Sequence, residues 1–219
     1  MTDWPIDAEL ASRREQMVRD QLVERGISHP AVLAAMRAVP RHEFVAASQR
    51  AFAYDDRPLS VGYGQTISQP YMVAVMTEAL DPHLDERVLE VGTGSGYQAA
   101  VLARLVREVI SIECVPELAA QAGETLRQLR ITNVTLIVGD GTLGYPERQP
   151  YDGIIVTAGA PAVPKTLIAQ LGEGGRVVIP VGSQMYQELF VIRRREGKIV
   201  EEHREGCVFV PLRGTYGWG

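Results

Sequence analysis

The chain has 219 residues, of which 46% are hydrophobic and 22% charged, and its formal net charge is −5 at pH 7. This composition excludes a disordered chain, and the negative charge argues against a protein that binds nucleic acid through a basic face. No uninterrupted apolar run approaches the roughly 18 residues of a membrane span, and the polar N-terminal segment is unlike a secretory signal. The length fits a single domain, and we expect a monomeric cytoplasmic protein.

The first third of the chain predicts helices joined by turns. Apolar residues recur at helical spacing from Leu10 to Leu22, and Gly26 is placed to end that helix. A second helix is expected from Pro30 to the residue before Pro40. Residues 54–69 contain two glycines and a proline without apolar periodicity, which predicts a long loop of the kind that is often functional. Pro70 then opens a third helix that runs to Leu80.

After Pro82 the pattern changes to alternating strands and helices. Strands are expected over residues 87–91, 109–112, 134–138, 154–156 and 176–181, and helices over 97–105, 116–129 and 164–171. Continuous β-branched runs between helices are typical of a parallel sheet covered on both faces. Apolar segments at 189–192 and 208–210 flank a polar stretch and predict antiparallel strands at the C-terminal edge. We therefore predict an α/β fold with a doubly wound, mostly parallel sheet and a helical N-terminal extension.

Three alternating glycines form the most informative motif. Gly92, Gly94 and Gly96 directly follow the strand at 87–91 and precede a helix. Without Cβ atoms, such a turn can adopt positive φ and let a ligand approach the backbone closely. In doubly wound sheets, ligands bind at the carboxyl ends of the strands, where this turn lies. A plain β–α turn is the alternative, but it accounts for one glycine better than for three.

Two cofactor classes fit this turn. The run from Gly94 to Ala99 satisfies the dinucleotide pattern G-x-G-x-x-G/A, and Glu113 follows Gly94 by 19 residues, so a nicotinamide dehydrogenase stays an alternative. Glu90, however, stands two residues before the first glycine and gives E-x-G-x-G-x-G, which matches the first motif of Rossmann-like S-adenosylmethionine-dependent methyltransferases. Asp140 lies between two glycines after the third strand, where such enzymes contact adenine. These two acids favour S-adenosylmethionine.

The acids can bind this cofactor in distinct ways. Glu113 can accept hydrogen bonds from both ribose hydroxyls, and Asp140 can accept one from the adenine amine. Glu90 either positions the amino-acid end of the cofactor or braces the turn. Cys114, next to Glu113, is expected to act as a small apolar neighbour of the cofactor.

Segments outside the glycine turn resemble the protein-L-isoaspartate O-methyltransferase family, from about residue 10 to residue 212. The similar segments are PRHEFV at 40–45, GQTISQPYMVA at 64–74, GDG at 139–141 with GY at 144–145, PYDGI at 150–154, LGEGGR at 171–176 and VPL at 210–212. The GQTISQP block is specific, because it is absent from methyltransferases in general. The last residues, RGTYGWG from Arg213 onward, lie outside the resemblance.

The resemblance implies methyl transfer from S-adenosylmethionine to the free α-carboxylate of L-isoaspartyl residues in damaged proteins and peptides, which initiates their repair and leaves S-adenosylhomocysteine. It implies one methyltransferase domain over residues 1–219, with a helical extension and substrate loop at 1–80 and the cofactor-binding sheet core at 81–219. Ser68 is the implied catalytic residue, and Thr66, Ser68, Thr157 and Ala158 would bind the substrate. The implied cofactor-binding residues are Ile67, Gln69, Pro70, Glu90, Gly92, Thr93, Gly94, Ser95, Gly96, Glu113, Cys114, Asp140 and Gly141.

This reaction requires little acid–base chemistry from the protein. A carboxyl group with a pKa near 4 is already ionised at pH 7 and needs no general base. The Ser68 hydroxyl can orient the carboxylate by donating a hydrogen bond, which makes it an orienting residue rather than a nucleophile. Its structural alternative is to cap the helix that starts at Pro70.

The expected partners are isoaspartyl-containing proteins and peptides, without nucleic acid or membrane. The four histidines show no ligand spacing, so no metal is expected. Two other functions stay open at this point. One is methylation of a different carboxylate or a small molecule, and the other is a cofactor-binding interaction protein without turnover.

Overall fold

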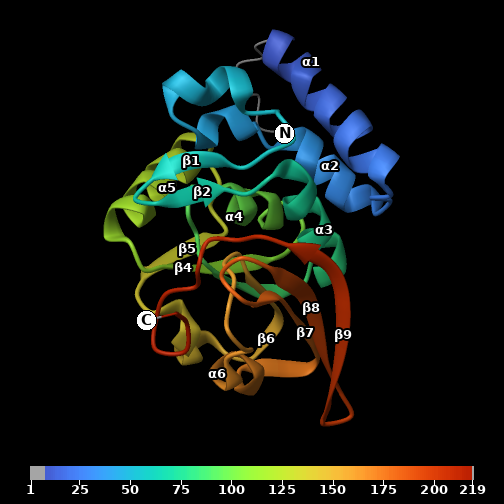
Figure 1. Cartoon of the computed structure of the whole chain (residues 1–219), viewed down its shortest axis with the longest axis vertical. Helices are drawn as coiled ribbons and strands as arrows, with labels where there is room; N and C mark the ends of the chain where they lie inside the picture. Colours follow the sequence, from blue (N-terminus) through green and yellow to red (C-terminus); the bar gives the residue numbers. More distant parts are fainter. Residues whose placement is uncertain (1–7, 219) are drawn as a thin grey trace.

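A seven-stranded sheet forms the centre of the molecule, which we describe from a computed structural model for residues 8–218 (Figure 1). Its strands are β3 (Arg87–Val91), β4 (Glu108–Glu113), β5 (Val134–Val138), β6 (Tyr151–Val156), β7 (Leu171–Gly182), β8 (Gln187–Arg195) and β9 (Lys198–Cys207). The order across the sheet is β5-β4-β3-β6-β7-β8-β9. The first five strands in this order are parallel, and β8 and β9 add antiparallel. The predicted α/β fold with an antiparallel C-terminal edge is confirmed.

Both faces of the sheet are buried. The helices that follow the N-terminal segment are α3 (Pro70–Leu80), α4 (Tyr97–Leu102), α5 (Pro116–Gln128) and α6 (Lys165–Ala169). Alternate strand residues belong to two apolar clusters: Val88 packs with side chains of α3, α4 and α5, whereas Leu89 packs with Leu167 of α6 on the opposite face. This two-sided burial is why the strand segments read as continuous apolar runs. No helix within residues 8–218 has both the length and the apolar character needed to cross a bilayer.

The N-terminal extension packs on the same face as α3. Its helical segments are α1 (Ala8–Gln16), the π-helical η1 (Met17–Leu22), the 3-10 helix η2 (Val23–Arg25), α2 (Pro30–Ala38), and the 3-10 helices η3 (Arg41–Phe44) and η4 (Ala47–Phe52). Gly26 ends η2 in the left-handed conformation, as predicted. Met17, Leu22 and Met36 are buried in the cluster that also contains Val88. In Figure 1, α1 and α2 lie at the opposite end of the view from α6.

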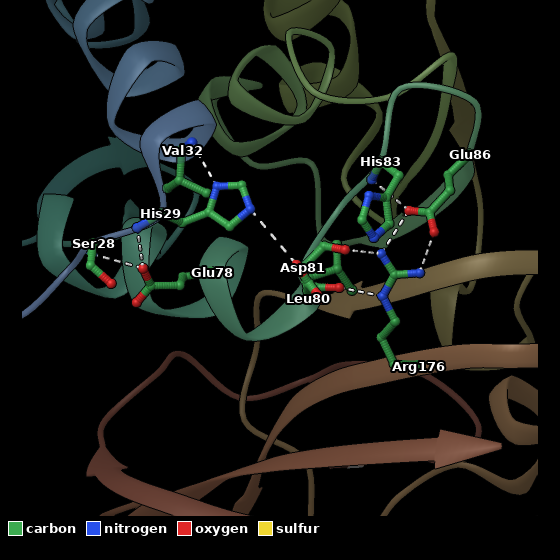
Figure 2. Close-up of polar contacts among 9 residues, drawn as sticks. All are labelled: Ser28, His29, Val32, Glu78, Leu80, Asp81, His83, Glu86 and Arg176. Atoms are coloured by element: carbon green, nitrogen blue, oxygen red, sulfur yellow. Dashed lines mark hydrogen bonds and ion pairs between the residues drawn. The ribbon is translucent and has the colours of Figure 1, made fainter. Parts of the chain in front are cut away.

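Helix α3 is fixed at its C-terminal end by buried polar contacts (Figure 2). Arg176 of β7 donates to the carbonyl oxygens of Leu80 and Asp81 and pairs with both carboxylate oxygens of Glu86 at 2.5 and 2.6 Å. These bonds satisfy terminal carbonyls that a helix cannot satisfy itself. On the other side, Glu78 accepts from the backbone N–H of His29 at 2.7 Å. Helix α3, which begins two residues after Ser68, is therefore held to both the sheet and the extension.

The long loop predicted over residues 54–69 is partly a hairpin. Strands β1 (Leu59–Gly62) and β2 (Gln65–Ile67) pair antiparallel, with Leu59 opposite Ile67. Tyr63 and Gly64 both have positive φ, which allows the tight reversal. The hairpin presents the segment that leads into Ser68 as ordered backbone rather than as a free loop.

The C-terminal edge differs from the expected pair of strands. The polar stretch that we expected to be a connection is itself strand β9, and residues 208–210 lie outside any strand, so the strand predicted there is wrong. Because β9 is an edge strand that pairs only with β8, nine of its ten residues are exposed and no apolar alternation is required. The apolar residues 208–210 instead run back toward the carboxyl ends of the parallel strands.

Candidate functional site

The glycine turn after β3 has the conformation that its sequence predicts. Gly92, Gly94 and Gly96 have φ values of 96°, 53° and 87°. A Cβ atom on Gly92 would lie 2.5 Å from the hydroxyl oxygen of Thr157, so this position admits no side chain. Thr157 in turn donates to the Gly92 carbonyl oxygen at 2.6 Å and braces the turn from the end of β6.

Glu113 links the turn to the end of β4. One carboxylate oxygen accepts from the Gly94 N–H at 2.7 Å, and the other accepts from the Val115 N–H at 3.0 Å and from the Cys114 thiol at 3.6 Å. A carboxylate has about four acceptor positions, so capacity remains for a ligand hydroxyl. Glu113 therefore braces the turn and also lines the cleft beside it.

Glu90 lies beneath the turn rather than in the cleft. Its side chain is fully buried, and one oxygen accepts from the Ser111 hydroxyl at 2.5 Å, which itself lies 2.5 Å from the Thr93 hydroxyl. The other oxygen has no hydrogen-bond partner in the described part of the chain. Burial, with a smaller contribution from the Glu113 charge, raises the pKa of Glu90 to about 8 in spite of the Ser111 hydrogen bond. At neutral pH the group is therefore mostly protonated. Of the two roles that we considered for it, this geometry favours bracing the turn.

Asp140 is occupied by two backbone segments. One carboxylate oxygen accepts from the N–H and hydroxyl of Thr142 at 2.9 and 2.6 Å, and the other accepts from the N–H and hydroxyl of Thr215 at 2.7 and 2.8 Å. Partial burial opposes ionisation, but these hydrogen bonds outweigh it and lower the pKa of Asp140. All four acceptor positions are thus filled, and the side chain does not line the cleft.

The C-terminal strap, defined here as residues 211–218, closes one side of the cleft. The Leu212 N–H and the Trp218 indole N–H both donate to the Gly159 carbonyl oxygen, at 2.8 and 2.9 Å. The Tyr216 N–H donates to the Thr142 hydroxyl at 3.2 Å. Because Pro211, Leu212 and Arg213 line the cleft, these bonds hold a wall of it in place.

Ser68 enters the cleft from the N-terminal side. The N-cap of α3 is Gln69, which makes no side-chain capping bond, so the alternative that Ser68 caps this helix is wrong. Within residues 8–218, its hydroxyl takes part in no hydrogen bond, whereas its carbonyl oxygen accepts from Arg41 at 2.7 Å. Arg41 is fully buried, and its guanidinium lies 4.9 Å from the ring centroid of Tyr97, the first residue of α4. Burial lowers the pKa of Arg41 to about 10, so it stays charged at pH 7 and ties the acceptor segment to the start of α4, which follows the glycine turn.

The structure brings most of the predicted site residues into one cleft, with about 820 Å³ of empty space that includes its open mouth. The predicted residues that line it are Thr66, Ile67, Ser68, Gly92, Thr93, Gly94, Ser95, Glu113, Cys114, Gly141, Thr157 and Ala158. The predicted residues outside its lining are Gln69, Pro70, Glu90, Gly96 and Asp140.

About as many lining residues were not among the predicted site residues. These are Gln65, Val73, Met76, Val91, Tyr97, Gln98, Ile112, Val210, Pro211, Leu212 and Arg213. Helical periodicity marks Val73 and Met76 as apolar, but it does not show that they face a ligand rather than the core. Within the described part of the chain, no group of three or more His, Cys, Asp or Glu side chains could hold a metal ion.

Comparison with known proteins gives one consistent family. A family model described as protein-L-isoaspartate(D-aspartate) O-methyltransferase matches residues 12–217. The chain is 53% identical over 205 residues to the protein-L-isoaspartate O-methyltransferase of Methanoculleus marisnigri. The aligned region covers 94% of this chain and 93% of the relative. It is 55% identical over 208 residues to protein-L-isoaspartate O-methyltransferase 2 of Pelobacter propionicus. This aligned region covers 94% of this chain and 92% of that relative.

Solved structures agree with the sequence comparisons. A protein-L-isoaspartate O-methyltransferase superposes with a TM-score of 0.85 at 32% identity, over 93% of this chain and 67% of that chain. A Plasmodium falciparum protein in complex with S-adenosyl-L-homocysteine superposes with a TM-score of 0.79 at 26% identity, over 91% of this chain and 98% of that chain.

Proposed function

The chain belongs to the protein-L-isoaspartate(D-aspartate) O-methyltransferase family, and we infer that it transfers a methyl group from S-adenosylmethionine to the free α-carboxylate of L-isoaspartyl residues in damaged proteins and peptides. This methylation starts their repair. The observation that carries the inference is that one cleft joins the glycine turn to Ser68 and its neighbours in the GQTISQP segment. The turn fits the cofactor, and the segment fits the acceptor.

The residues of the cleft fit S-adenosylmethionine. When bound, this cofactor supplies a methyl group activated by a positively charged sulfur. The turn from Gly92 to Ser95 would hold its amino-acid end, with Glu90 and Gly96 bracing the turn from below, and Glu113 would hold its ribose. Cys114 and Gly141 would line the adenine position. These assignments are supported by positive φ in the turn and by the acceptor capacity left on Glu113.

Asp140 would reach the adenine amine only if one of its hydrogen bonds from Thr215 were exchanged for it, because its acceptor positions are filled. Ile67, Gln69 and Pro70 would close the cofactor site from the acceptor side. Of these three residues, Ile67 lines the cleft directly.

Ser68 would orient the acceptor. The isoaspartyl carboxylate is ionised at neutral pH, so no residue has to remove a proton before it attacks the methyl carbon. A hydroxyl that donates one hydrogen bond fixes a carboxylate oxygen without neutralising it, and Thr66, Thr157 and Ala158 would form the rest of the acceptor wall. Correct placement of two reactants contributes up to roughly 7–11 kcal/mol to catalysis. The unused hydroxyl of Ser68 and the buried Arg41 that holds its backbone support this role.

The site needs both parts of the chain. Ser68 belongs to the extension and substrate loop at 1–80, whereas the glycine turn and Glu113 belong to the sheet core at 81–219. This supports one methyltransferase domain over residues 1–219. A monomeric cytoplasmic enzyme that acts on proteins rather than on nucleic acid or membranes is part of the same proposal. The net charge of −5 supports the part of it that concerns nucleic acid.

Transfer of radiolabelled methyl groups to matched peptides tests this function. Two peptides that differ only in one L-isoaspartyl or L-aspartyl residue are offered with labelled S-adenosylmethionine. We expect base-labile label on the isoaspartyl peptide alone. Equal labelling of both peptides would indicate a broader carboxylate methyltransferase, and cofactor binding without labelling would indicate a binding protein without turnover.

A further inference from the structure

A side groove adjoins the cleft at Ser68. It is lined by Arg25, Pro58, Thr66, Ser68, Gln69, Tyr71, Met72 and residues 205–210. Thr66 and Ser68 line both the cleft and this side groove, so the two are continuous at the proposed acceptor position. A peptide whose carboxylate contacts Ser68 would therefore run its neighbouring residues through the side groove.

The first wall of the groove, formed by Arg25 and Tyr71, carries the positive charge of Arg25, which an ion pair neutralises. The guanidinium of Arg25 lies 3.4 Å from the ring centroid of Tyr71 and pairs with Asp56 at 3.0 Å. Gln69 also donates to Asp56, at 2.7 Å, which holds this carboxylate in place beside the groove. The Arg25–Asp56 pair adds no net charge to the groove.

The β9 part of the lining carries an acid for which the described residues supply no counterion. Strand β9 contributes Glu205, and no ion pair or hydrogen bond of its side chain is found within residues 8–218. The other acids of the strand are paired: Glu201 with His203 at 2.7 Å, and Glu202 with Arg204 at 3.1 Å. Burial and, second, the Glu205 charge raise the pKa of Tyr71, which places this charge within electrostatic reach of the first wall.

We propose that Glu205 is a specificity-determining residue, which selects isoaspartyl substrates with a lysine or arginine close to the damaged residue and disfavours those with an acidic neighbour. The inference rests on the proposed function and goes beyond it, because it names a subset of substrates. The preference for basic over acidic neighbours follows from the charges that line the groove, because the charge of Arg25 is compensated and that of Glu205 is not. Exposed opposite charges attract modestly and like charges repel by a similar amount, so exchanging Lys for Glu in the substrate changes kcat/KM by on the order of tenfold.

The test uses a set of isoaspartyl peptides that carry Lys, Ala or Glu at one of the two positions on either side of the isoaspartyl residue. For the wild type we expect a Lys-to-Glu ratio of kcat/KM of about ten at the most sensitive position. In Glu205→Gln the ratio falls to within about twofold of one, and in Glu205→Lys it falls below one. Raising the salt concentration reduces the wild-type ratio, because exposed charges are screened.

Glu202→Gln is the matched control, since it removes an equal charge from the same strand outside the groove. It leaves the ratio at its wild-type value. Any of three results would overturn the proposal. The wild type could show no preference between Lys and Glu peptides, the Lys-to-Glu ratio could persist in both Glu205 variants, or Glu202→Gln could change the ratio as much as Glu205→Gln does. The alanine-flanked isoaspartyl and aspartyl peptides form a separate arm: if they are not discriminated, the proposed function fails, whatever the charge dependence is.

Discussion

Glu90 illustrates how one buried residue connects the stability of the protein to its cofactor site. It is fully buried under the glycine turn, and among residues 8–218 its side chain is hydrogen-bonded by Ser111, which also contacts Thr93 of the turn. Ionisation there would place an uncompensated charge in the interior, which is costly. The turn is thus supported by a neutral hydrogen-bonded carboxyl group.

This burial predicts a pH-dependent stability. The pKa of Glu90 is about 8 in the folded protein against 4.5 as its ordinary value, so its contribution is fully present below pH 4.5 and is lost as the pH rises toward 8. Over this window the free energy of unfolding falls by at most about 1.4 kcal/mol per pH unit through this group. We expect urea unfolding between pH 5 and 9 to show Glu90→Gln gaining stability over the wild type as the pH rises. A difference between the two proteins that does not change with pH would contradict the assignment.

Ser68 gives a second prediction at this scale. Ser68→Ala removes the hydroxyl proposed to orient the acceptor, and a hydrogen bond to a charged group is worth about 1.5–3 kcal/mol. We expect methyl transfer to an isoaspartyl peptide to fall by roughly 10- to 100-fold, with the cofactor Kd from calorimetry within about threefold of the wild type. Ser60→Ala, on the exposed position of β1 in the same hairpin, is the control and retains wild-type turnover. Unchanged turnover in Ser68→Ala would remove Ser68 from the mechanism.

Individual elements were predictable where local pattern and burial agree. The parallel strands and α3 follow from apolar runs and from proline at the helix start. Strand β9 does not, because an exposed edge strand is stabilised by backbone pairing with β8 and needs no apolar side chains. The hairpin of β1 and β2 is too short for periodicity to reveal, and its only local signal is the Tyr63-Gly64 turn.

The C-terminal strap gives a prediction at the scale of an element. Gly214 has a φ of 133°, and a Cβ atom there would lie 2.0 Å from a carboxylate oxygen of Asp140. Gly214→Ala therefore displaces the strap and opens the cleft wall at Pro211–Arg213. We expect S-adenosylhomocysteine to dissociate roughly tenfold faster, a loss of about 1.4 kcal/mol if association is unchanged, measured by stopped-flow competition.

Gly197→Ala provides the control for backbone strain. Gly197 has a φ of 71° in the β8–β9 hairpin, and a Cβ atom there would meet no atom within 4 Å. An alanine there carries a left-handed penalty of about 1–2 kcal/mol, but the position lies away from the cleft. Equal dissociation rates in the two variants would show that the strap does not retain the cofactor.

At the scale of the whole molecule, the sequence predicts the fold class and places the cofactor turn and the acceptor segment on different parts of the chain. Contacts between residues far apart in the sequence were beyond prediction. Thr215 meets Asp140 across 75 residues, and Arg41 meets Ser68 across 27, with no local pattern at either end. Such pairs are set by how the layers pack, so Glu90 and Asp140 could be recognised as important while their surroundings could not.

The central claim is that one cleft presents the methyl group to a carboxylate held at Ser68. A crystal structure with S-adenosylhomocysteine and an isoaspartyl peptide tests it most directly. We predict a ribose hydroxyl against Glu113 and a carboxylate oxygen of the peptide about 2.5–3.0 Å from the Ser68 hydroxyl. An isoaspartyl carboxylate bound elsewhere, with a different side chain in that position, would contradict it.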